Sequence, residues 1–251
     1  MTLATLSIVS HGHGVLLTQA LDDLSRQRRV AECRIVVTLN LVDEVFDPAP
    51  YEGLRLTVLR NSRPKGFGAN HNAAFAHCDS PWFVVLNPDI RMPGTDALEA
   101  LVATLPAQVH GLTAPLVTNS AGVPEDSVRS NLTPASLVAR AFGHRKRLDV
   151  SRPASLGHPF FWLAGMCLVV NAEAYREVHG FDERFFLYCE DYDLCARLYS
   201  RGYSLVVDET VQVIHDAQRD SHRSRKHLRW HLESLLRVWL SAAFWRVVRR
   251  G

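Results

Sequence analysis

The sequence has few features of an exported, disulfide-stabilised or membrane-spanning protein. Five cysteines are scattered over 251 residues without a Cys-x-x-Cys pair, which indicates neither a disulfide framework nor a zinc site and favours a reducing cytosol. The N-terminus lacks a basic stretch followed by an apolar run, and no segment reaches the ~18 uncharged apolar residues of a membrane span. Internal repeats, low-complexity segments and long linkers are also missing. We therefore expect one compact cytoplasmic unit.

Charge is balanced overall but not along the chain. The formal net charge is +2, yet basic residues crowd the segment 223–251, where Leu228, Leu232, Leu235, Leu236, Trp239, Leu240, Phe244 and Trp245 are spaced for a helix. Leucine, tryptophan and arginine together suit a helix at a membrane surface. A helix that packs on the body of the protein, or on a second subunit, explains the pattern equally well.

Strand-like and helix-like segments alternate through the rest of the chain, which predicts an α/β fold with a mostly parallel central sheet flanked by helices. Residues 127–158 have poor periodicity and many basic residues, so we expect a mobile loop or a solvated charged segment there. The strands are expected at residues 6–10, 34–39, 54–59, 82–86, 109–117, 160–170, 204–207 and 211–214.

Two segments are candidates for phosphate and metal binding. Glycines after Lys65 let the backbone approach a ligand before a helix from about residue 69 to 77, although a plain tight turn explains them equally well. Asn87-Pro88-Asp89 ends a continuous apolar strand, where open α/β sheets bind ligands, and Asp89 could coordinate a divalent cation. The alternative is a simple turn. His215, also at a strand end, is either structural or a second metal ligand.

The stretch from Gly180 to Cys195 mixes carboxylates with aromatic rings. Buried unpaired carboxylates are costly and many exposed rings are unusual, so the mix favours a lined cleft. Glu190 and Asp191 open a helical pattern, where acids are favoured by the helix dipole alone. Two adjacent acids beside rings can also be poised for proton transfer, which predicts a general base.

Together these motifs resemble family 2 glycosyltransferases of the GT-A fold, in particular the bacterial rhamnosyltransferase-like branch. The resemblance covers residues 6–234. It rests on Ser7-Ile8-Val9-Ser10, Lys65-Gly66-Phe67-Gly68-Ala69-Asn70-His71-Asn72, Leu86-Asn87-Pro88-Asp89, Gly180-Phe181-Asp182-Glu183-Arg184-Phe185-Phe186, Glu190-Asp191-Tyr192-Asp193-Leu194-Cys195-Ala196-Arg197, and His215 followed by Ser221.

The resemblance implies an inverting, metal-dependent enzyme with a nucleoside-diphosphate-sugar donor. Asp89 and His215 are then metal ligands for Mg²⁺ or Mn²⁺, and Asp191, with Glu190 beside it, deprotonates the acceptor hydroxyl. The implied donor contacts are Ser10, His11, Asn40, Lys65, Gly66, Phe67, Asn72, Asn87 and Asp89. The implied acceptor contacts are Trp162, Gly165, Asp182 and Tyr188. The segment around Asn40 departs from the family's Asp-Asn-x-Ser type, and Asn87 replaces the first acid of its Asp-x-Asp motif.

The expected reaction is transfer of a deoxyhexose, with dTDP-rhamnose as donor, to a glycan or polyprenyl-linked acceptor in surface polysaccharide synthesis, such as O-antigen or cell wall. Residues 1–95 are expected to bind the nucleotide sugar, residues 96–222 to bind the acceptor and carry catalysis, and residues 223–251 to form the tail. The protein is expected in the cytoplasm, with peripheral contact to the inner face of the plasma membrane and a homodimer left open, and with no nucleic-acid partner. A sugar nucleotidyltransferase and a non-catalytic sugar-nucleotide or glycan-binding module are the alternatives.

Overall fold

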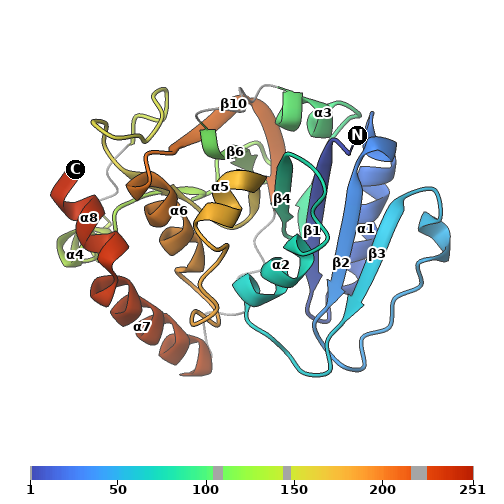
Figure 1. Cartoon of the computed structure of the whole chain (residues 1–251), viewed down its shortest axis with the longest axis horizontal. Coiled ribbons are helices and arrows are strands. Elements are labelled where there is room, and N and C mark those ends of the chain that lie inside the picture. Colours follow the sequence, from blue (N-terminus) through green and yellow to red (C-terminus); the bar gives the residue numbers. More distant parts are fainter. Residues whose placement is uncertain (1, 104–109, 144–147, 216–224, 251) are drawn as a thin grey trace.

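A computed structural model describes residues 2–103, 110–143, 148–215 and 225–250. Its centre is an eight-stranded sheet in the order β3-β2-β1-β4-β9-β6-β10-β5, with helices on both faces (Figure 1). The N-terminal strands pair in parallel, as the apolar runs predict. They are β1 (Ala4–Ser10), β2 (Arg34–Leu39), β3 (Arg55–Arg60) and β4 (Trp82–Leu86).

Helices α1 (Gly14–Ser25) and α2 (Phe67–Phe75) lie on opposite faces of this half of the sheet. The strand β4 shows why both faces are covered. Its side chains alternate, so that Phe83 and Val85 join the core beneath α2 while Val84 and Leu86 join the core beneath α1. Two short 3-10 helices, Val30–Glu32 and Ala49–Tyr51, connect these strands.

The second half of the sheet differs from the prediction at two places. Residues 160–170 form β8 (Phe161–Leu163) and β9 (Cys167–Asn171), separated by a turn, and not one long strand. Residues 204–215 form the single strand β10 (Ser204–His215), whose pairing with β6 (His110–Thr118) shifts register between Asp208 and Gln212. The side chain of Asp208 accepts hydrogen bonds from the backbone and hydroxyl of Thr210, which closes a bulge where a strand break is expected.

Antiparallel strands complete the large sheet. The strand β9 lies between β4 and β6, and the short β5 (Ile90–Arg91) pairs with the end of β10. A helix α3 (Ala97–Ala103) covers the same face as α1, whereas α5 (Ala172–Glu177) and α6 (Glu190–Ser200) cover the α2 face. Asn171 is the N-cap of α5, as predicted, because its side chain accepts hydrogen bonds from the N–H groups of Glu173 and Ala174.

The segment expected to be a loop contains regular structure. The strand β7 (Val128–Ser130) pairs with β8 in a second, two-stranded sheet, and α4 (Pro134–Ala141) follows with Thr133 as its cap. Thr133 was not expected to start a helix, because the basic residues after it obscure the apolar spacing. The predicted ends of α3 and β6 at Leu105 and Val109, the basic residues 144–147, and Ser221 and Arg223 fall outside the described residues.

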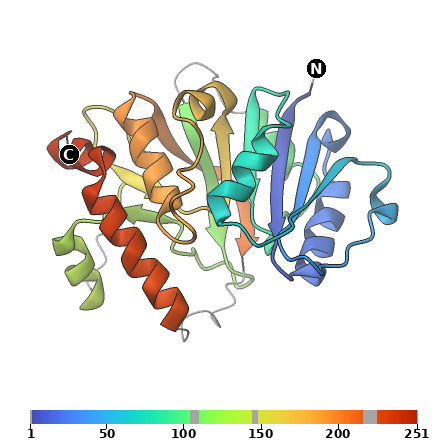
Figure 2. The ribbon, with the colours of Figure 1, turned by 60° about the horizontal axis from the view of Figure 1, so that its bottom comes forward.

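The tail consists of two helices rather than one. Helix α7 (Arg225–Leu240) stops before Ser241, and α8 (Ala242–Arg250) turns back onto the body (Figures 1 and 2). Leu235, Val238, Phe244 and Val247 are buried in the core on the α6 side of the sheet. The tail therefore packs on the body with one of its faces. Within the described part of the chain, no helix is long and apolar enough to cross a bilayer.

Candidate functional site

The C-terminal ends of β1, β2 and β4 bring polar residues to one edge of the sheet. Ser10 ends β1, Asn40 follows β2, and Asn87 follows β4. Because the three strands run in parallel, these residues meet at the edge where open α/β sheets bind ligands. The structure thus brings together three of the predicted donor contacts from separate parts of the sequence.

Asn40 connects this edge to the glycine-containing turn. Its Oδ1 accepts a hydrogen bond from Lys65 N at 2.8 Å, and its Nδ2 donates to Lys65 O at 3.0 Å. The Nδ2 atom also lies 3.1 Å from Nδ1 of His11, whose pKa is lowered by burial and by His13. Asn40 therefore fixes the backbone of Lys65 and leaves the ammonium group at the exposed rim.

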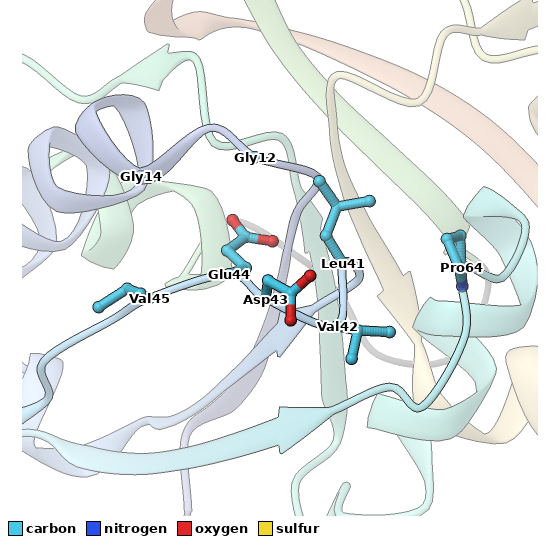
Figure 3. A pocket seen from close by; sticks show the side chains of 8 residues that line it. All are labelled: Gly12, Gly14, Leu41, Val42, Asp43, Glu44, Val45 and Pro64. Carbon is cyan, nitrogen blue, oxygen red and sulfur yellow. The ribbon is translucent and has the colours of Figure 1, made fainter.

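A cavity of about 540 Å³ opens beside these residues. Gly12, Gly14 and Pro64 line it together with residues 41–45 (Figure 3). In the figure, Asp43 and Glu44 extend from the segment after β2, with Gly12 and Gly14 above them. The hydroxyl of Ser10 donates to one carboxylate oxygen of Glu44, while the other oxygen is buried without a partner among the described residues. The cavity thus offers hydrogen-bond acceptors next to apolar walls.

The glycines of the turn are explained by contacts within the protein. A Cβ on Gly66 would lie 2.7 Å from the carbonyl oxygen of Phe186, and one on Gly68 would lie 2.5 Å from Cβ of Phe181. The N–H of Phe67 donates to that same carbonyl of Phe186 at 3.0 Å. These glycines therefore let α2 approach the segment 180–189, which we call the acceptor loop after the acceptor contacts expected at Asp182 and Tyr188.

Asn72, a predicted donor contact, is used in the same packing. Its Nδ2 donates to Phe181 O and to Glu183, and its Oδ1 accepts from Tyr175 and from Phe181 N. All four hydrogen-bonding positions of the amide are filled by protein groups. The structure thus corrects the prediction for Asn72. Its side chain holds the start of the acceptor loop and has no atom left to contact the nucleotide-sugar donor.

Asp89 and His215 meet through strand pairing. The pair β5–β10 sets His215 opposite Ile90, and Nε2 of His215 lies 3.2 Å from Oδ2 of Asp89. The Oδ1 atom of Asp89 is buried and, among the described residues, has no hydrogen-bond partner. A carboxylate oxygen aimed into a site without a protein donor fits a divalent cation, as does a neighbouring imidazole. No group of three or more acidic, histidine or cysteine side chains gathers around it in the described residues.

Asp191 is held at the start of α6 by two backbone N–H groups. Its Oδ2 accepts from Gly165 N at 3.0 Å and its Oδ1 from Tyr192 N at 2.8 Å. The preceding residues Tyr188 and Cys189 both have positive φ, at 73° and 64°, which is unfavourable for residues with a side chain. This backbone turns the acceptor loop sharply into α6 and presents Asp191 next to the turn between β8 and β9.

Burial raises the pKa of both Glu190 and Asp191, but the shift is stronger for Glu190. Glu190 is 5% exposed, and burial and the charge of Asp191 raise its pKa well above the usual value. Burial also raises the pKa of Asp191, but Arg129 and its backbone donors oppose this shift. A proton shared by the pair is therefore held on Glu190, which leaves Asp191 ionised and able to accept one.

Arg129 of β7 is a site residue that sequence reasoning missed. It contributes positive charge at Asp191 and lies 5.1 Å above the ring of Trp162. Trp162, a predicted acceptor contact, is 3% exposed and donates to Ser130 O, so its role is to support this strand pair. Only the pairing of β7 with β8 brings Arg129 here, and a three-residue strand carries no sequence signal.

The remaining predicted acceptor contacts lie on the acceptor loop. Asp182 accepts hydrogen bonds from the side chain and the backbone of Arg184, which closes a turn. The hydroxyl of Tyr188 lies 2.8 Å from Nδ1 of His227 on α7, and the ring of Phe186 stacks on Trp230 at 4.7 Å. The acceptor loop is therefore enclosed between α2 and α7, and the role of α7 here was also missed.

One turn joins the two sets of residues. Met166 O accepts from Asn87 N at 2.9 Å, while the adjacent Gly165 N donates to Asp191. The turn between β8 and β9 therefore connects the segment that carries Asp89 with the start of α6, which carries Asp191. This arrangement can bind an anionic group at one end and accept a proton from a nucleophile at the other.

Comparisons with known proteins agree with this geometry. A family model described as glycosyltransferase like family 2 matches residues 5–232. Rhamnosyltransferase WbbL of Escherichia coli is 30% identical over 244 residues, covering 92% of this chain and 90% of its own. The N-acetylglucosaminyl-diphospho-decaprenol L-rhamnosyltransferase of Mycobacterium tuberculosis is 31% identical over 173 residues, which is 61% of this chain and 53% of that one.

Solved structures support the fold. The mannosyltransferase PcManGT of Pyrobaculum calidifontis, in complex with GDP-Man and Mn²⁺, superposes with a TM-score of 0.67 over 98% of this chain and 68% of its own, at 17% identity. GalNAc-T7 with UDP, GalNAc and Mn²⁺ gives a TM-score of 0.65 over 96% of this chain and 49% of its own, at 16% identity. The GT-A expectation for the fold is confirmed.

Proposed function

This chain belongs to glycosyltransferase family 2 and is a glycosyltransferase, and on that premise we propose that it transfers L-rhamnose from dTDP-rhamnose to a hydroxyl of a glycan or polyprenyl-linked acceptor. Two rhamnosyltransferases among its relatives support the sugar. The mycobacterial relative's name supports an N-acetylglucosaminyl diphospho-polyprenol acceptor, and hence a step in surface polysaccharide synthesis. Family membership favours glycosyl transfer over the nucleotidyltransferase and binding-module alternatives.

The observation that carries the proposal is the position of Asp191. Two backbone donors and Arg129 favour its ionised form, while its neighbour Glu190 retains a proton. An ionised carboxylate at the mouth of the acceptor loop can take the proton from an acceptor hydroxyl as that oxygen attacks the anomeric carbon. Attack from the face opposite the leaving diphosphate inverts the configuration at that carbon.

Asp89 and His215 are the residues that would hold a divalent metal, Mg²⁺ or Mn²⁺. When bound, the metal would neutralise charge on the diphosphate and on the leaving oxygen. The orphaned Oδ1 of Asp89 fits this role, and Mg²⁺ commonly takes one or two protein ligands and completes its shell with phosphates and water. Lys65, at the exposed rim beside Asn40, supplies a further cation for the same charge.

The nucleoside is proposed to occupy the cavity between Gly12 and residues 41–45. The free carboxylate oxygen of Glu44 can accept a hydrogen bond from a base N–H or a sugar hydroxyl. Ser10, His11 and Asn40, which neighbour the cavity residues in sequence, would contact the rest of the donor. Residues 1–95 thereby bind most of the donor, and residues 96–222 contribute the base, the acceptor loop and His215. The boundary between 222 and 223 lies outside the described residues.

The test is thermal stabilisation of the purified protein by a panel of nucleotide sugars, each with and without Mg²⁺ or Mn²⁺. A ligand that binds only the folded protein raises its apparent stability, by about 2.7 kcal/mol at a hundredfold excess over its dissociation constant. We expect a metal-dependent shift with dTDP-rhamnose that UDP- and GDP-sugars do not match. If another nucleotide sugar stabilises the protein more, the proposal of rhamnose as the transferred sugar is wrong.

A further inference from the structure

The tail helix α7 carries a row of leucines on its outer face. Leu228, Leu232, Leu236 and Leu240 recur every fourth residue and are 60%, 52%, 55% and 85% exposed. Residues four apart are neighbours on a helix surface, so the leucines form one continuous apolar row along α7. We call this row the leucine face. The following helix α8 adds Trp245, which is 49% exposed.

The leucine face is separate from the face that packs on the body. Leu235 and Val238 of α7 are buried in the core, and Ser234 donates to Leu187 O of the acceptor loop. Helix α7 therefore has two apolar faces, of which the inner one is covered. Nothing in the described part of the chain covers the outer one, and α7 runs along the outer side of the molecule in both views (Figures 1 and 2).

Positive charge surrounds the leucine face. Arg229 and Arg237 are exposed on α7, and Arg246, Arg249 and Arg250 are exposed on α8. Glu233 is the one acid among residues 225–250, and it pairs with Arg229 at 2.7 Å. An apolar row with arginines beside it matches the two chemical regions of an anionic membrane surface, which are the apolar acyl chains and the negatively charged phosphates.

We propose that the leucine face of α7 docks on an anionic phospholipid surface, with α7 lying in the plane of the headgroups. The leucines enter the acyl boundary and the arginines contact lipid phosphates. A second copy of the chain fits this face less well, because a symmetric contact through it brings two arginine clusters together without opposing acids.

Docking in this way brings the acceptor loop close to the lipid. The side of α7 away from the leucines carries His227 and Trp230, which contact Tyr188 and Phe186 of the acceptor loop. A helix with its side chains is about 10–12 Å across, so the loop lies about one helix diameter from the headgroups. This consequence rests on the proposed function, since it places the sugar of a lipid-linked acceptor at the level of the site.

The experiment is co-sedimentation of the full chain with phosphatidylcholine vesicles, with and without phosphatidylglycerol. We expect binding that requires phosphatidylglycerol and weakens with salt. Leu236→Glu should lower the bound fraction about tenfold, because it replaces an inserted side chain with a charge that anionic lipid repels. The matched control is Val123→Glu, which places the same charge at a side chain of similar exposure, 56% against 55% for Leu236, in the turn after β6 and should bind normally.

Three results overturn the proposal. The first is equal vesicle binding by Leu236→Glu and Val123→Glu, and the second is no binding by the wild type. The third is a wild-type dimer in sedimentation velocity without lipid that Leu236→Glu dissociates, which assigns the face to a second copy. Vesicle binding is read without donor or acceptor, so it is independent of the proposed reaction. If both proposals hold, Leu236→Glu transfers sugar normally to a short-chain soluble acceptor and poorly to one embedded in vesicles.

Discussion

The Oδ2 atom of Asp191 accepts a hydrogen bond of 3.0 Å from the backbone N–H of Gly165. The two residues lie 26 positions apart, and the contact exists because the chain turns between β8 and β9 instead of continuing as one strand. The same turn holds Asn87 through Met166 O. Asp191 and the segment that leads to Asp89 are thereby both held by the same turn, which favours a constant spacing between the proposed base and the proposed metal ligand.

Replacing Asp89 with alanine should remove the dependence of donor binding on metal. The carboxylate is one of two protein groups that would hold the cation, and the diphosphate would supply others. We expect Asp89→Ala to lose most of the additional thermal stabilisation that Mg²⁺ or Mn²⁺ gives with the donor. Asp96→Ala, at an exposed acid that pairs with Arg28, is the control and should keep it. An unchanged metal effect in Asp89→Ala would remove Asp89 from the metal site.

Glu190→Gln should change how stability depends on pH. The pKa of Glu190 in the folded protein is well above that of the unfolded chain, so the folded state binds more protons above about pH 4.5. Stability then falls as pH rises from the unfolded pKa toward the folded one. Glutamine mimics the neutral acid, and the variant should lose this part of the decline and become the more stable protein at alkaline pH.

The measurement is the free energy of unfolding in urea at a series of pH values for the wild type and Glu190→Gln. Buried acids that do not interact with Glu190, such as Asp193, contribute equally to both proteins and cancel in the difference. If the free energies of unfolding of the two proteins ran parallel with pH, Glu190 would be ionised in the folded protein. That result would contradict the assignment of a proton to Glu190.

Gly66→Ala should disturb the contact between α2 and the acceptor loop. The new Cβ would lie 2.7 Å from Phe186 O and 2.9 Å from Phe186 Cα, and backbone cannot move aside as a flexible side chain can. We expect a loss of about 1–3 kcal/mol in the free energy of unfolding, together with a lower kcat/KM. Gly53→Ala is the matched control, since a Cβ there meets no atom within 4 Å and should leave both quantities unchanged.

The parts of the fold that depend on local pattern could be predicted from sequence. The apolar runs that became β1, β2 and β4, the Asn171 cap and the helix starting at Glu190 are confirmed. The break between β8 and β9 could not be predicted, because Leu163 to Cys167 is apolar throughout and only the tertiary contacts of Gly165 favour a turn.

The structure places several of the predicted site residues together and adds partners that the sequence did not indicate. Asp89 and His215 are neighbours as expected, whereas Asn72 and Trp162 support the surrounding structure. The roles of Arg129 and of α7 depend on pairing between segments distant in sequence, which no local motif encodes. The glycines at 66 and 68 carried a real signal of close approach, but the approaching group is the acceptor loop.

The most direct test of the account is transfer of labelled rhamnose from dTDP-rhamnose to an N-acetylglucosaminyl diphospho-polyprenol, by the wild type and by Asp191→Asn. The amide keeps the shape of the carboxylate but cannot accept the hydroxyl proton, so we expect kcat to fall by about 10²–10⁴ while the donor dissociation constant stays within about twofold. Asp96→Asn serves as the control. Transfer by Asp191→Asn at the wild-type rate, or a donor affinity lost in the same proportion, would contradict the role of Asp191 as the base.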